Sequence, residues 1–131
     1  MTQDRIPITS PFDSVDPAPP SLESEVDILR STLCDENERM FQRMRALFAL
    51  RNKGGNCAVD ALCAAFDSES ALLKHEIAYV LGQMQNCHAV PTLIERLSDE
   101  SEDLMVRHEA AEALGAIGDR TAMSTLSNFV D

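Results

Sequence analysis

The sequence predicts an all-α protein in which two-helix units repeat along the chain. Three observations predict this fold: the composition, a segment that recurs at a nearly constant spacing, and a second apolar segment after each copy. Aromatic residues make up 5% of the 131 residues and Trp is absent, whereas hydrophobic residues reach 44%. A core that is poor in aromatic rings and rich in Ala, Leu and Met suits closely packed helices better than packed β-sheets. The length allows one domain of ordinary size.

The recurring segment marks the first helix of each unit. It occupies residues 44–50, 75–81 and 108–114, so successive copies are 31 and 33 residues apart. A turn that contains Gly or Asn follows each copy, and the second helix is expected at residues 58–66, 89–97 and 122–130. Units of this period bury their apolar faces on their neighbours, which predicts an α-solenoid, a HEAT-like stack of helical hairpins. An irregular helical bundle is the weaker alternative, because it imposes no fixed period.

The start of the chain differs in composition from the repeats. Five of the six prolines lie in the first 20 residues. Proline fixes φ and lacks a backbone donor, so residues 1–20 are expected to form a flexible tail or linker. Residues 21–131 are expected to form the repeat domain. It would begin with a helix at residues 22–33, whose Leu and Val residues keep a helical period.

Charge and cysteine content exclude several classes of function. The formal net charge is −11, from 22 acidic and 11 basic residues. Such a surface repels phosphate backbones and attracts a cationic partner, so we expect no nucleic acid as a ligand. No apolar run approaches the roughly 20 residues of a membrane span. The four cysteines form no CxxC pair and no signal peptide is apparent, so we expect reduced thiols in a cytoplasmic protein.

Two His-Glu pairs, His75-Glu76 and His108-Glu109, stand at equivalent positions of adjacent units. At about 100° per residue, His75 lies about 160° and Glu76 about 100° from Ile77, the centre of the apolar stripe. The next unit gives the same result, so neither histidine is expected on its own helix's packing face. Adjacent helices lie about 8–10 Å apart, which lets the four side chains converge on one cation. Two histidines and a carboxylate form a known ligand set for non-haem Fe(II).

A single surface His-Glu pair usually has no function, and only the repetition in register favours a metal site. The zinc-protease pattern is absent, because no second histidine follows four residues on. His88 stands in a turn and has no repeated counterpart, so it is expected to be solvated. Lys74 and Arg107 precede the two pairs, where they could pair with carboxylates or be solvated.

The segments LLKHEIAYVLGQMQ (residues 72–85) and MVRHEAAEALGAIGD (residues 105–119) resemble the metal-binding repeats of the deoxyhypusine hydroxylase family. The resemblance extends through MRALFALRNKGG and SVDPAPP, and covers about residues 12–128. The two His-Glu motifs in order and in context are its specific part. Repeats such as EALGAIGD also occur in phycobilisome-lyase-type repeat proteins, which can be scaffolds.

The resemblance implies an iron enzyme that uses oxygen to hydroxylate the deoxyhypusine side chain of translation initiation factor 5A. Members of the family have two halves, each with two His-Glu motifs, around a pair of irons, and this chain resembles the C-terminal half. The resemblance implies His75, His108 and Glu109 as iron ligands. It places Glu76 nearer to the substrate, as a catalytic residue or a weaker ligand.

The chain carries two of the family's four His-Glu motifs. We therefore expect either a homodimer or a need for a missing N-terminal half, whether the chain is a fragment or a natural half-length protein. The rival hypothesis is a metal-free HEAT-like scaffold for protein–protein interaction.

Overall fold

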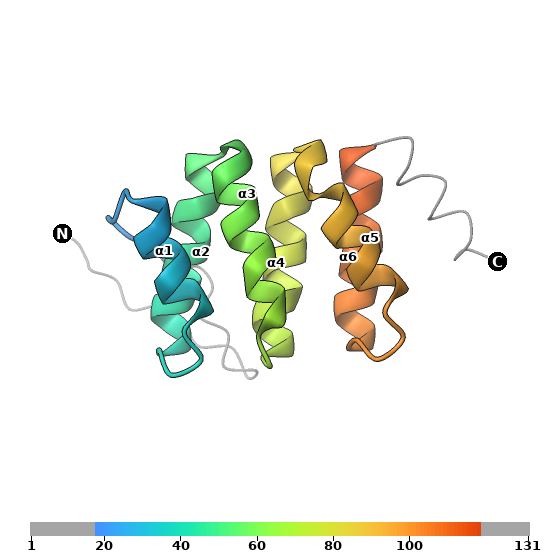
Figure 1. Cartoon of the computed structure of the whole chain (residues 1–131), viewed down its shortest axis with the longest axis horizontal. Helices are drawn as coiled ribbons and strands as arrows, with labels where there is room; N and C mark the ends of the chain where they lie inside the picture. Colours follow the sequence, from blue (N-terminus) through green and yellow to red (C-terminus); the bar gives the residue numbers. More distant parts are fainter. Residues whose placement is uncertain (1–17, 119–131) are drawn as a thin grey trace.

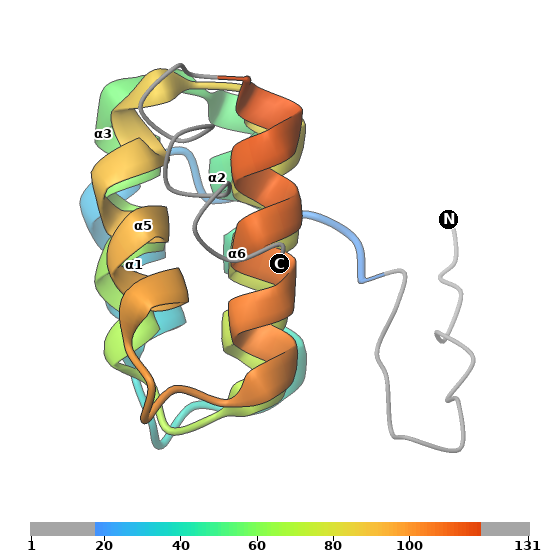
Figure 2. The same cartoon turned by 90° about the vertical axis from the view of Figure 1, so that its right-hand side faces the viewer.

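The computed structural model describes residues 18–118, which form two layers of α-helices. The helices are α1 (Val26–Cys34), α2 (Met40–Lys53), α3 (Gly55–Ala64), α4 (Ala71–Met84), α5 (Val90–Ser98) and α6 (Leu104–Ile117), with 3-10 turns η1 (Ala65–Asp67) and η2 (Cys87–Ala89). One layer contains α2, α4 and α6, and the other contains α1, α3 and α5 (Figures 1 and 2). The predicted all-α stack of helical hairpins is confirmed. No described helix is long and apolar enough to cross a bilayer.

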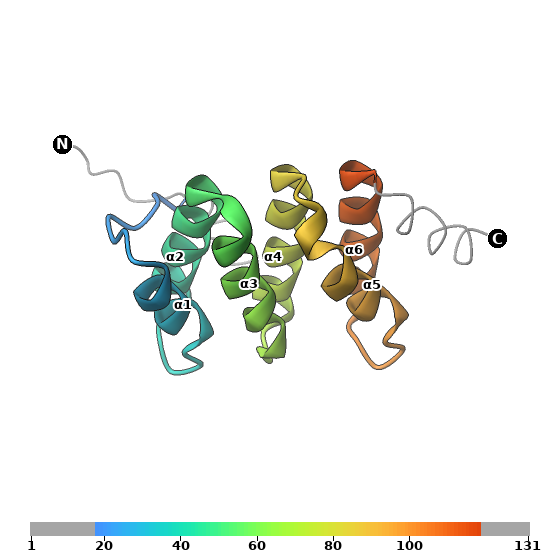
Figure 3. The ribbon, with the colours of Figure 1, turned by 45° about the horizontal axis from the view of Figure 1, so that its top comes forward.

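The first helices of the three units are α2, α4 and α6, each 14 residues long. They contain the recurring segments, and α4 and α6 stand next to each other (Figure 3). The predicted start of the first helix at residue 22 is wrong, because α1 begins at Val26 and Leu22 is 95% exposed. The Glu23 carboxylate accepts hydrogen bonds from the backbone N–H groups of Ser24 and Glu25. These local bonds give the backbone an alternative to the helix.

The described residues include only the last part of the predicted tail. Ala18 is buried, the Ser21 N–H donates to the Arg45 carbonyl oxygen at 3.0 Å, and Arg45 Nε donates to the Pro19 carbonyl oxygen at 3.2 Å. Residues 18–20 are therefore packed along α2. Residues 1–17, and the expected second helix of the third unit at residues 122–130, lie outside the described part of the chain.

One apolar core fills the space between the two layers. The predicted stripes of α4 and α6 supply much of it, with Leu73, Ile77, Val80, Leu81, Val106, Ala110, Ala113 and Leu114 all buried. Both helices begin at a side-chain cap: Ser70 Oγ accepts from the Leu73 N–H, and the Asp103 carboxylate accepts from the Met105 and Val106 N–H groups. Such caps satisfy donors that a helix leaves unpaired in its first turn. The starts of α4 and α6 are thus fixed.

Two arginines connect the units where the first helices begin. Arg43 is 2% exposed, and its Nε donates to the carbonyl oxygen of Leu33 near the end of α1 at 2.8 Å. Arg107 holds the equivalent position in α6, and its Nε donates to the carbonyl oxygen of Leu97 near the end of α5 at 3.0 Å. The last carbonyls of a helix lack partners within it, so each arginine satisfies one of them.

Lys74, the third cation at this repeat position, forms an ion pair instead. Its Nζ lies 2.7 Å from Oε2 of Glu102, a buried carboxylate in the loop between α5 and α6. Arg96 NH1 lies 2.9 Å from the other oxygen, and the Asp103 N–H donates to Oε2 at 2.9 Å. Burial opposes ionisation of Glu102, but the hydrogen bonds from Lys74, Asp103 and Arg96 and the lysine charge outweigh it and lower the pKa. The cluster therefore ties α4, α5 and the start of α6 together.

We predict that Glu102→Gln lowers the free energy of unfolding near pH 7 by about 1–3 kcal/mol, because it leaves the partly buried cations of Lys74 and Arg96 without their carboxylate. A carboxyl group whose pKa is lowered by folding stabilises the fold above its unfolded pKa of about 4.3. That contribution is lost as the pH falls through the lower folded value. The difference between the two proteins should thus shrink in acid, which urea unfolding at several pH values will measure. Glu100→Gln, at an exposed position of the same loop, is the control; an equal loss there would contradict the prediction.

Candidate functional site

Two of the predicted site residues meet between adjacent units. His75 on α4 and Glu109 on α6 place Nε2 and Oε1 3.0 Å apart. The Glu109 residue is 8% exposed, whereas 32% of the His75 side chain is exposed. Burial of a carboxylate without a partner is costly, so the imidazole stabilises Glu109 at the edge of the core. The contact joins α4 and α6, the first helices of two adjacent units. It lies on the surface where the equivalent repeat positions of the two His-Glu motifs predict it.

The other two predicted residues have different surroundings. His108 is exposed, and its Nε2 lies 2.9 Å from Oε2 of Glu112 one turn later on α6. Glu76 is half-buried on α4. Sequence reasoning missed Glu112 as a partner, although the i,i+4 spacing is a signal for such a pair. Among residues 18–118, the His, Cys, Asp and Glu side chains form no group of three or more that could hold a metal ion.

The His75–Glu109 pair fits a metal ion as well as a direct hydrogen bond. Ligands bound at about 2.1 Å on perpendicular axes of an octahedral ion lie about 3.0 Å apart. Nε2 and Oε1 have this separation here. Imidazole nitrogen and carboxylate oxygen are also the donor types found at non-haem iron. The donor set therefore fits iron, and a single pair leaves most coordination positions for other ligands.

The approach of α4 to α6 depends on Gly82. A Cβ atom at this position would lie 3.0 Å from Cα and 3.2 Å from Cβ of Ala113. Gly82 follows His75 by seven residues, and Ala113 follows Glu109 by four. At these spacings the paired residues lie on the same side of each helix. The small residues thus set the separation at which the His75 imidazole reaches the Glu109 carboxylate.

A groove continues from Glu109 along the two helices. The α4–α6 groove encloses about 260 Å³, and its lining includes Tyr79, Gln83, Glu109, Glu112, Ala113 and Ala116. Tyr79 is 48% exposed. The groove is therefore lined by an aromatic ring and two carboxylates, and it lies next to the His75–Glu109 pair.

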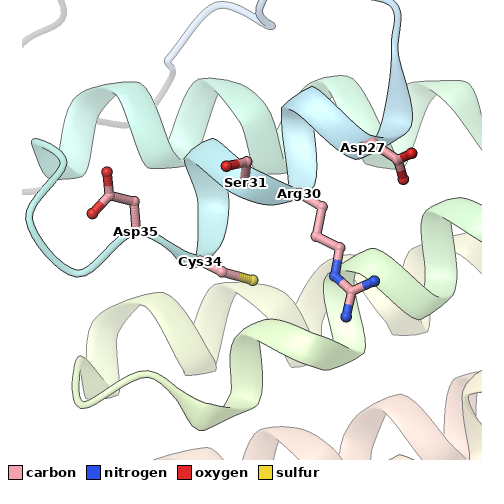
Figure 4. Close-up of a pocket in the computed structure, with 5 residues that line it drawn as sticks. All are labelled: Asp27, Arg30, Ser31, Cys34 and Asp35. Atoms are coloured by element: carbon pink, nitrogen blue, oxygen red, sulfur yellow. The ribbon is translucent and has the colours of Figure 1, made fainter.

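A second hollow lies on the other layer, along α1. It encloses about 480 Å³ and is lined by Asp27, Arg30, Ser31, Cys34 and Asp35 (Figure 4). Burial raises the pKa of the Cys34 thiol, against the opposing charges of Arg30 and Arg43, so the thiol is neutral at pH 7. A neutral thiol is a poor nucleophile and metal ligand. This hollow contains no histidine and is separate from the His-Glu surface.

The third histidine has a partner that sequence reasoning did not predict. His88 is exposed, as expected for a turn residue, but its Nε2 lies 2.7 Å from Oδ1 of Asp60 on α3. The pair links η2 to α3, on the layer away from His75. His88 is therefore not part of the candidate site.

Comparison with known proteins gives one family and a set of close relatives. A family model for HEAT repeats matches residues 59–131. Deoxyhypusine hydroxylase-B of Oryza sativa subsp. japonica is 52% identical over 121 residues, which are 92% of this chain and 40% of that protein. Deoxyhypusine hydroxylase of Homo sapiens is 49% identical over 125 residues, which are 95% of this chain and 41% of that protein. The resemblance inferred from the His-Glu motifs is thereby confirmed.

A solved structure agrees with the sequence matches. The structure of human deoxyhypusine hydroxylase in complex with glycerol aligns with a TM-score of 0.86 and 49% sequence identity. The alignment covers 95% of this chain and 43% of that chain. This chain thus spans about two-fifths of the length of the curated relatives that it matches.

We predict that Gly82→Ala lowers the free energy of unfolding by about 1–2 kcal/mol. The added methyl group overpacks the contact with Ala113, and the gain in helix propensity, about 1 kcal/mol, offsets only part of that cost. Gln83→Ala, at an exposed position of the same helix, should change stability by less than about 0.5 kcal/mol. Urea unfolding of the three proteins measures both values. If Gly82→Ala were as stable as the parent, α6 would be able to move away from α4 at no cost. That result would contradict the inference that packing fixes the separation of the two helices.

Proposed function

We propose that this chain, which belongs to the HEAT-repeat family, supplies one metal-holding surface of a deoxyhypusine hydroxylase. The observation that carries the proposal is the 3.0 Å contact between His75 and Glu109 of adjacent units. Deoxyhypusine hydroxylases that are about half identical over 92–95% of this chain support it. The proposed reaction is oxygen-dependent hydroxylation of the deoxyhypusine side chain of translation initiation factor 5A. The net charge of −11 suits such a cationic side chain.

The proposed iron ligands are His75, His108 and Glu109. Bound iron would supply the activation of oxygen needed to hydroxylate a C–H bond. His75 would bind through an imidazole nitrogen and Glu109 through a carboxylate oxygen, and the packing of α4 on α6 orients both. Glu76, beside His75, is the proposed catalytic residue, whose carboxylate would accept a hydrogen bond from the substrate's ammonium group.

A second surface would complete the ligand set. Of the proposed ligands, His75 contacts Glu109, whereas His108 contacts Glu112 instead. Two irons need more protein ligands than these residues supply. We therefore propose that the His-Glu surface faces either a second copy of this chain or a separate half with its own His-Glu motifs. The segment 18–118 would then correspond to the C-terminal half of its relatives.

A metal-free scaffold is the second candidate function. Leu72, Leu104 and Met105 are large apolar residues at the starts of α4 and α6, and each is 41–75% exposed. Exposed apolar residues that lie together often mark protein interaction sites. The same side chains would also serve an interface with the other half of an enzyme, so iron content is the measurement that separates the two functions.

The proposed compartment is the cytoplasm. All four cysteines are free, and the two in described helices α1 and α3 that are partly buried, Cys34 and Cys63, have pKa values raised by burial. Unpaired thiols persist in reducing compartments, which supports this location.

We predict that His75→Ala and His108→Ala each reduce the iron bound per chain by at least tenfold. Each variant removes an imidazole ligand from outside the core, so the helical circular-dichroism signal should stay within a few per cent of the parent. His88→Ala is the matched control, because it removes a histidine that pairs with Asp60 on the other layer. Iron content by atomic spectroscopy and far-UV circular dichroism test the prediction together. Equal iron in His75→Ala and His88→Ala would contradict the proposed ligand set.

We further predict that the chain hydroxylates its substrate only as a dimer or after addition of a separately made N-terminal half. One His-Glu surface does not hold enough ligands for a pair of irons. Light scattering gives the mass in solution, and mass spectrometry of the deoxyhypusine-bearing factor gives the extent of hydroxylation. Activity from a strictly monomeric preparation would show that one surface suffices, and so would contradict the prediction.

A further inference from the structure

We propose that the α4–α6 groove binds a long alkyl-ammonium chain and that Tyr79 and Glu112 select it. The identity of the natural ligand, the extended cationic side chain of the substrate, rests on the proposed function. The chemistry of the groove does not require iron. The inference assigns a role to Tyr79 and Glu112, two lining residues outside the proposed ligand set, although the groove ends at the proposed ligand Glu109.

The groove exists because small residues face each other between the two helices. Gly82 and Ala113 are in close contact, and Ala113 and Ala116 lie on the α6 side of the groove. Larger side chains line it around them, with Tyr79 and Gln83 on α4. At about 260 Å³ the groove is below the roughly 300–1,000 Å³ of pockets for drug-sized ligands. Its size suits one flexible side chain.

The lining combines apolar contact with negative charge. Tyr79 is 48% exposed, which allows the methylene groups of an alkyl chain to pack on its ring and a cation to lie over the ring face. Glu109 and Glu112 supply carboxylates, each within 3.0 Å of one imidazole. A carboxylate accepts about four hydrogen bonds, so the contact with His108 leaves oxygen lone pairs of Glu112 for an ammonium group. An alkyl-ammonium chain matches both properties, whereas an anion or a neutral alkane matches at most one.

The groove also has a suitable position and length. Glu109, at one end, contacts His75, and Ala116 follows it by seven residues along α6. At about 1.5 Å per residue this stretch is about 10 Å long. A bound chain would therefore extend from the proposed iron ligands along the two helices. This arrangement would hold one end of the chain beside the reacting centre.

The test uses the chain's single tyrosine as its probe. The sequence contains one Tyr and no Trp, so tyrosine emission reports directly on Tyr79. The full 131-residue chain, free of metal, is titrated with 1-aminohexane and, in parallel, with 1-hexanol. We expect a saturable change with the amine and at least tenfold weaker binding of the alcohol. Backbone amide shifts of Gln83 and Ala116, measured by NMR, provide a second readout at the two sides of the groove.

Two variants test the charge and the space separately. Glu112→Gln removes one carboxylate charge, and Ala116→Leu fills the groove at an exposed helical position where Leu is well tolerated. Each should weaken binding of 1-aminohexane at least threefold, while Glu100→Gln, an exposed charge in the loop before α6, should leave it unchanged. Ala116→Leu should also bind as much iron as the parent.

The outcomes separate this inference from the proposed function. Absence of saturable binding by both readouts, equal affinity for amine and alcohol, or unchanged affinity of Ala116→Leu would each overturn the inference. If the chain binds the amine as expected but holds no iron, the groove assignment stands and the proposed iron site fails. If iron binding depends on His75 and His108 but the amine does not bind, the proposed iron site stands and the groove assignment fails.

Discussion

The contact between Gly82 and Ala113 is the constraint on which the candidate site depends. Packed helices usually lie about 8–10 Å apart, and the side chains at the contact decide where in that range they settle. With no side chain at Gly82, the backbone of α6 lies within 3.0 Å of where a Cβ would be. Two turns away on α4 and one turn away on α6, the same approach lets His75 reach Glu109. The His75–Glu109 contact and the α4–α6 groove therefore both depend on the close packing of Gly82 against Ala113.

The charged residues next to the His-Glu pairs contact other elements of the fold. Lys74 precedes His75 and pairs with the buried Glu102, while Arg107 precedes His108 and binds the Leu97 carbonyl. Buried charges are tolerated only when they are paired, so these contacts are demanding in geometry. They fix the starts of α4 and α6 to neighbouring elements. A site needs its supporting residues held in this way if its donors are to keep their positions.

The repeats and their core could be predicted from the sequence because both follow from a period. The recurring segments gave three helices in the right places, and the apolar stripe around Ile77 is buried. The start of α1 could not be found in this way, because Leu22 keeps the helical period while the Glu23 side chain bonds the backbone that follows. Periodicity describes which face a residue occupies, and it does not describe local side-chain bonds that compete with a helix.

The candidate site was likewise predictable only in part from the sequence. The register placed His75 and Glu109 on neighbouring helices, but it could not tell that Glu109 is 8% exposed or that His108 contacts Glu112. Those details depend on the separation of α4 from α6, which Gly82 sets and a helical count ignores. The pairing of Lys74 with Glu102 could not be predicted from the sequence either. Glu102 lies in a loop, where no hydrophobic periodicity indicates which way a side chain points.

The use of basic residues inside the fold affects the surface that a ligand meets. Arg43, Lys74 and Arg96 have side chains that are 3–20% exposed and are paired with carboxylates or carbonyls. The carboxylates of Glu109 and Glu112 contact the imidazoles of His75 and His108 rather than a lysine or an arginine. The fold thus directs several of its few cations to internal contacts. The surface of α4 and α6 is left with net negative character, which is the property that a site for a cationic chain requires.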